Sequence, residues 1–275
     1  PRAVIEPRPA DPIDIAVANF LWAALGDPRS SVRWQAAHAV RTAIELGASD
    51  VIVALGLAVM RGDAAGYADE RFVFYEMSAA EWFLVAVERV AHAYPSAIDA
   101  LMFAVVGLSD RYPDHATIQR HCSSITRLAA TPVGRSVGTD WGNILLDPKV
   151  LERLHRPPHS APMLKGAPQG EYRFHFDFDE CVLRTLTEAF VITHQEVLDA
   201  ASALILDEWG WRDRGSALED PRRTAAVYED GETYGYKWEV PKAEDLTYYL
   251  ERHAALTIGG RLMRTTTPYR DPDLA

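Results

Sequence analysis

The chain has 275 residues, of which 48% are hydrophobic and 24% are charged. That composition supports a buried core and excludes a chain that is disordered throughout. The formal net charge of −11 comes mostly from residues 171–275 and repels a phosphate backbone, so we expect no nucleic-acid partner. The longest apolar stretch, near Val51 to Met60, is too short to cross a bilayer, so we expect no membrane contact either.

The only two cysteines, Cys122 and Cys181, lie in different segments and have no CxxC spacing. This favours reduced, buried thiols and a cytoplasmic location over a disulfide scaffold. The sequence opens at Pro1 without a methionine. We therefore expect either a processed protein or a piece of a longer one.

The first half of the chain has the spacing of paired helices. Residues 13–25 have one apolar face, and the Asp27-Pro28 turn leads into a second helical segment with apolar residues up to Ala43. Together the two segments make a unit of about forty residues, which is the size of a helical repeat.

A register of 43 residues connects this unit to two later ones. The shift places Ala36 on Ala79 and then on Cys122, so small side chains recur where two helices must approach closely. We predict that these three residues are equivalent buried positions between paired helices.

The first unit resembles the HEAT-repeat family. It matches the pattern D-P-x-x-x-V-R-x-x-A-A, and the residues that carry the match are Asp27, Pro28, Val32, Arg33, Ala36, Ala37 and Arg41. The likeness covers about residues 13–130, although the later units keep the small residues and lose the Val-Arg pair. It implies an α-solenoid that serves as a scaffold or binding surface, without a particular chemistry.

Arg33 and Arg41 lie about two helical turns apart and therefore share one side of their helix. If both are exposed, they form a local basic strip that could bind a ligand. The alternative is a pair of solvated arginines that bond to carboxylates such as Asp27.

Residues 131–170 are rich in proline and glycine, which predicts a linker. A small α+β domain is predicted to follow over residues 171–268. Its expected elements are a strand at 172–178, a helix at 182–190, a helix that starts at a Thr193–Glu196 capping box and stops at Gly210, a hairpin within 225–240, and a last helix after Pro241. His253 falls on the apolar face of this last helix and is interpreted as a core histidine.

The stretch FHFDFDE places His175, Asp177 and Asp179 on one face of the predicted strand. One imidazole and two carboxylates could bind Mn²⁺, Zn²⁺ or Fe²⁺ and support a metal-dependent hydrolase. In the alternative interpretation, which we favour, the phenylalanines between them fill a core and the three polar residues face water or Arg173.

Other side chains could also bind a ligand. Tyr234, Tyr236 and Trp238 alternate along the predicted hairpin, either as a stacking platform or as its packed face. His121 in the third repeat is expected to face outward. The chain has no GxxxxGK[ST], GxGxxG, HExxH or GxSxG motif, and we expect no cofactor.

The second half is similar to the C-terminal regions of large bacterial NTPases of the STAND/NACHT type. The likeness is carried by the FHFDFDE strand, the Trp209-Gly210 helix end, the segment TYYLERHAALTIGG and Thr267-Pro268. It implies a non-catalytic sensor part of a larger protein, several of which act in anti-phage defence. We therefore expect a protein-binding or ligand-sensing module whose partner is another protein or other domains of a longer chain.

Overall fold

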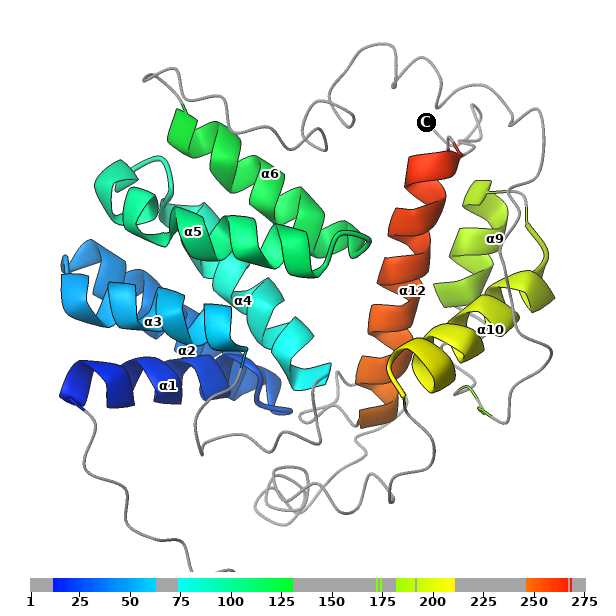
Figure 1. Cartoon of the computed structure of the whole chain (residues 1–275), viewed down its shortest axis with the longest axis horizontal. Helices are drawn as coiled ribbons and strands as arrows, with labels where there is room; N and C mark the ends of the chain where they lie inside the picture. The colour runs from blue at the N-terminus through cyan, green and yellow to red at the C-terminus, as the bar shows by residue number, and fades with distance from the viewer. Residues whose placement is uncertain are drawn as a thin grey trace, which may run out of the picture.

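The computed structural model describes residues 12–62, 74–130, 172, 174, 182–190, 192–210, 246–266 and 268 (Figure 1). These residues are mostly helical and include no strand, which confirms the mostly α class. The predicted linker, the hairpin and most of the strand at 172–178 lie outside the described residues.

The first part of the chain forms two layers of helices. The layers are built from α1 (Ile13–Leu25), α2 (Ser30–Glu45), α3 (Ser49–Arg61), α4 (Phe74–Val90), α5 (Pro95–Arg111) and α6 (Ala116–Ala130). Helices α1, α3 and α5 lie side by side in one layer, and α2, α4 and α6 lie side by side in the other (Figure 1). We call these six helices the helical array.

The 43-residue register is confirmed in the second layer. Ala36, Ala79 and Cys122 are at most 5% exposed, and they occupy matching places on α2, α4 and α6. Their small side chains let neighbouring helices approach closely. The first layer has unequal steps instead, because α1, α3 and α5 begin at Ile13, Ser49 and Pro95, which are 36 and then 46 residues apart.

A second group of helices follows. It consists of α9 (Arg184–Phe190), α10 (His194–Ala203), a π-helix η2 (Leu204–Glu208) and α12 (Leu246–Thr265). The predicted capping box at Thr193 and Glu196 is present, and Gly210 ends the helix with a φ of 65°. Helix α12 packs against α9 and α10 on one side and against α4 and α6 on the other (Figure 1).

Gly260 allows α12 to approach the array very closely. A Cβ atom at this position would lie 1.8 Å from the backbone oxygen of Asp114, so no larger residue fits here. On the next turn, Arg261 and Arg264 each bond to the Asp114 carboxylate at 3.0 Å. The turn between α5 and α6 is therefore held directly by α12.

The array has two different edges, because consecutive antiparallel helices place their turns alternately at opposite ends. We call the edge with turns 26–29 and 112–115 the sealed edge, since α12 covers it (Figure 1). We call the edge with turns 46–48 and 91–94 the open edge.

Candidate functional site

The two arginines of the first repeat have separate roles. Arg33 is buried and donates to the backbone carbonyls of Asp27 and Pro28, at 2.8 and 3.0 Å, and to the Tyr249 hydroxyl. Arg41 is exposed and bonds to Glu45 at 2.7 Å. The two arginines do not form a shared exposed basic strip, because Arg33 is buried and its hydrogen bonds connect the α1–α2 turn to α12.

Several predicted site residues lie outside the described residues, namely His175, Asp177, Asp179, Tyr234, Tyr236 and Trp238. Their roles stay predictions. Within the described ranges, no group of three His, Cys, Asp or Glu side chains could hold a metal ion. Among the same residues, no helix is both long and apolar enough to span a membrane.

His121 was expected to face outward, and this expectation is wrong. It is buried, and its Nδ1 lies 2.5 Å from the Glu88 carboxylate of α4. The reason is that α6 contacts α4 as well as α5, so more of its circumference is covered than a single apolar face suggests. Its neighbour Cys122 is buried as expected, and burial raises the pKa of the thiol to about 12.

A chain of buried hydrogen bonds crosses the sealed edge from the α5–α6 turn through α12 to α4. His253 Nε2 lies 3.0 Å from Ser78 Oγ, and His253 Nδ1 lies 2.9 Å from His115 Nε2. His115 Nδ1 accepts a bond from the Ile118 amide at 3.4 Å. We call Ser78, His253 and His115 the buried relay.

The direction of the relay argues against catalysis. Because His115 Nδ1 accepts from the backbone, the ring proton is on Nε2 and is donated to His253 Nδ1. His253 then carries its own proton on Nε2 and donates it to Ser78. A serine nucleophile needs the opposite arrangement, with a histidine that accepts the hydroxyl proton. Ser78 is also buried, so substrate cannot reach it.

Burial keeps both histidines neutral. It lowers the pKa of His115 to about 4, where Arg252 adds to the effect and Glu81 opposes it. Burial also lowers the pKa of His253 well below its ordinary value, and the neighbouring His115, Arg252 and Arg33 act in the same direction. Arg252 of α12 bonds to Glu81 of α4 at 2.5 and 3.1 Å. The relay is thus a structural link between α12 and the array.

The outer side of the α1–α3–α5 layer exposes large apolar residues. On α1 and α3 they repeat at the helical spacing i, i+4, i+7, and Leu57 is 51% exposed. Single exposed apolar residues are ordinary, but a row repeated on adjacent helices is typical of an interaction surface. We call this surface the outer face; its residues are Ile13, Val17, Phe20, Val53, Leu57, Met60 and Phe103.

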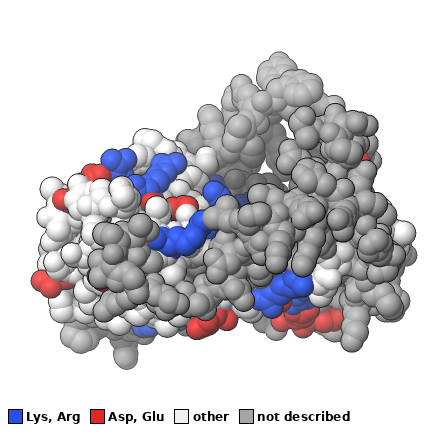
Figure 2. Space-filling model, turned by 90° about the horizontal axis from the view of Figure 1, so that it is seen from above, with Lys and Arg blue, Asp and Glu red and all other residues white. Residues whose placement is uncertain are grey.

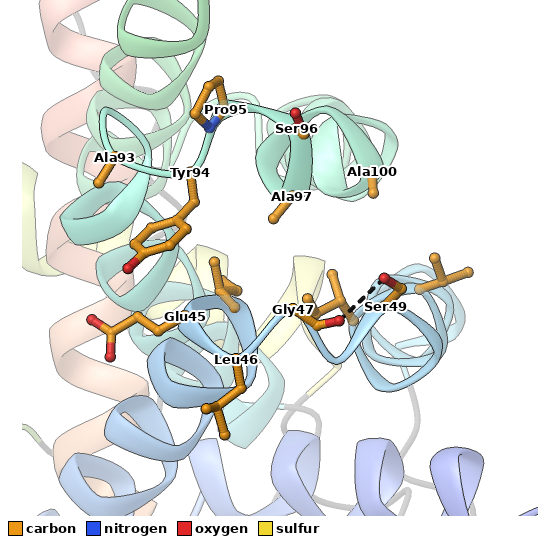
Figure 3. Close-up of a pocket in the computed structure, with 13 residues that line it drawn as sticks. Glu45, Leu46, Gly47, Ser49, Ala93, Tyr94, Pro95, Ser96, Ala97 and Ala100 are labelled. Atoms are coloured by element: carbon orange, nitrogen blue, oxygen red, sulfur yellow. Dashed lines mark hydrogen bonds between the residues drawn. The ribbon is translucent and has the colours of Figure 1, made fainter.

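A pocket of about 520 Å³ opens at the open edge, between the α2–α3 and α4–α5 turns (Figure 3). Its walls are mostly apolar, with Leu46 and Tyr94 from the two turns. Val53 lines the pocket and also belongs to the outer face, so the two surfaces are continuous. We call this the edge pocket, and Glu45 is the one charged residue among its thirteen lining residues.

The charged side chains do not suggest a nucleic-acid surface. On the face shown in Figure 2, the Arg side chains of the described residues, which include no Lys, are interspersed with Asp and Glu. Several arginines are also used in ion pairs at the sealed edge, where Arg252 bonds to Glu81 and Arg261 to Asp114 and Glu208. This distribution agrees with the acidic balance of the sequence.

The chain was compared with models of known protein families, with characterised proteins and with solved structures, and none of them matches it. The outer face and the edge pocket are features of this chain's own residues. The outer face could have been found from the sequence as a second row of apolar residues at i, i+4 and i+7 on α1 and α3, beside the row that fills the core. The edge pocket could not, because its walls come from two turns that are far apart in the chain.

Proposed function

We propose that this chain is a non-catalytic protein-binding module, a HEAT-like helical scaffold that holds a partner segment on its outer face and in its edge pocket. The observation that carries the proposal is the repeated apolar row. Val53 and Leu57 are about half exposed, although the same helix has fully buried residues such as Ala58 and Val59 for its core. Solvent exposure of such a row is unfavourable unless a partner covers it.

Two further features support a scaffold. The arrangement of the array in stacked helix pairs agrees with the HEAT-like pattern around Asp27 and Arg33, and helical repeats commonly present extended binding surfaces. The only Ser–His chain in the described part of the molecule is buried and has the wrong polarity for nucleophilic attack. The likeness of residues 171–268 to STAND-type NTPases extends the proposal to a sensor part of a larger cytoplasmic bacterial protein, of the anti-phage type.

A peptide selection tests this function. A library of random peptides of about 16 residues, enough for four helical turns, is selected against the purified chain. Peptides are then counter-selected against the Leu57→Asp variant, which places a charge in the centre of the outer face. The matched control is Trp34→Asp, the same change at an exposed aromatic residue on α2 of the other layer.

The expected result is a set of peptides that bind the parent chain and the Trp34→Asp variant but do not bind the Leu57→Asp variant. Circular dichroism should show that both variants keep the parent helix content. A selection that yields no peptide sensitive to Leu57→Asp overturns the proposed function.

A further inference from the structure

Resting on the proposed function, we infer that the partner segment carries basic residues beside apolar ones, with an apolar side chain in the edge pocket and Lys or Arg at its rim. The inference starts from the charges around the pocket. Asp50 and Asp99 are exposed and lie next to the lining residues Ser49 and Ala100. On their helices, Asp50 precedes the lining residue Val53 by three positions, and Asp99 follows the lining residue Ser96 by three. Residues three apart are neighbours on a helix surface, so both exposed side chains lie beside the pocket, at its rim.

The rim keeps a negative balance after its own ion pair is taken into account. Glu45 lines the pocket and bonds to Arg41 at 2.7 Å, so these two charges largely compensate. Asp50 and Asp99 remain, and none of the lining residues is basic. Exposed carboxylates around an apolar surface attract a partner of opposite charge and orient it.

The same charges discriminate between other occupants. A second copy of the chain would place the acidic rim against an identical acidic rim, which is unfavourable at close range. An anionic membrane surface is repelled in the same way. A long basic side chain suits this site, because its methylene stem can lie on apolar residues such as Val53 while its charge stays at the rim.

The test uses the peptides recovered with the parent chain and two double variants. Asp50→Asn with Asp99→Asn removes the rim charges. Asp110→Asn with Asp207→Asn removes two exposed charges elsewhere and keeps the same net charge as the first variant; Asp110 lies at the far end of α5 from the pocket.

We expect the recovered peptides to be enriched in Lys and Arg next to apolar residues. The rim variant should weaken their binding roughly threefold to tenfold, which is the combined contribution of two exposed charge pairs, and the control variant should not. Binding should also weaken at about 1 M salt, where the screening length is about 3 Å.

Two results overturn the inference. In the first, the peptides are sensitive to Leu57→Asp but show no basic enrichment and bind the rim variant as tightly as the parent; the proposed function then stands and the basic partner does not. In the second, sedimentation shows a dimer of the parent chain that Leu57→Asp dissociates, which identifies a second copy as the occupant. A selection without any sensitive peptide refutes the proposed function itself.

Discussion

The two edges of the helical array are built from the same kind of helix–turn–helix unit and differ in what covers them. At the sealed edge, α12 lies on the array and joins it through the buried relay, the Arg33–Tyr249 bond and the Arg252–Glu81 ion pair. At the open edge, the turns surround a pocket and Leu46 is 79% exposed. The comparison shows that the helical repeat alone leaves side chains and turns uncovered at both edges. Among the described residues, α12 covers the sealed edge, and no helix covers the open edge.

The sealed edge should be far more sensitive to substitution, and the largest effect is expected at Gly260. In Gly260→Ala the new Cβ atom meets the Asp114 backbone oxygen, which cannot rotate away, so the free energy of unfolding should fall by about 3 kcal/mol, the upper end of the usual cost of overpacking. Urea denaturation measures it.

Gly259→Ala is the matched control for this substitution. Its Cβ atom would lie 3.4 Å from a Leu186 methyl group, an ordinary contact. This variant should be neutral or more stable by up to about 1 kcal/mol, because alanine favours a helix over glycine. Equal effects of the two variants would show that α12 does not approach Asp114 as closely as described.

Lowering the pH should destabilise the same edge. The ordinary pKa of His115 is 6.5, and in the folded protein it is lowered to about 4. As the pH falls below 6.5, His115 takes up a proton in the unfolded chain but not in the folded one. The free energy of unfolding therefore keeps its full value above pH 6.5 and decreases as the pH is lowered to about 4. The loss from this one group is on the order of 3 kcal/mol.

The free energy of unfolding, measured from neutral pH down to pH 4, checks this expectation. His115→Gln removes the titrating group, so the variant should lose less stability over the same range than the parent chain. Parallel curves for the two proteins would contradict a buried, neutral His115.

A smaller effect is expected inside the relay. Ser78→Ala leaves the His253 Nε2 proton without its acceptor and should cost about 1–3 kcal/mol. Ser123 is buried to a similar degree, but its Oγ has no hydrogen-bond partner among the described residues, so Ser123→Ala should be neutral or stabilising. Thermal denaturation of both variants compares them. If Ser123→Ala lowers the stability as much as Ser78→Ala, the Ser78–His253 hydrogen bond makes no specific contribution to stability.

The smallest change in stability is expected on the outer face. Leu57→Asp should alter the free energy of unfolding by less than about 0.5 kcal/mol, as surface substitutions usually do. A loss of several kcal/mol would mean that Leu57 belongs to the core, and the outer face would then not be an interaction surface.

The elements that depend on neighbours in the chain were predictable. Apolar spacing located α1, α2 and the helix at 182–190, and Thr193 with Glu196 identified the start of α10, because periodicity and capping are local interactions. The burial of Ala36, Ala79 and Cys122 also followed from their repeat, since equivalent positions in stacked units meet equivalent neighbours.

By itself, the sequence determined the mostly helical class, the 43-residue register of the second layer and the core position of His253. Only the tertiary structure decided which groups meet across long separations in the chain. Ser78 and His253 are 175 residues apart, and Arg33 and Tyr249 are 216 apart. The docking of α12 converts Arg33 from an expected surface charge into a buried link and leaves the opposite edge open. No local pattern encodes that choice, because it depends on which faces remain uncovered after the helices have packed.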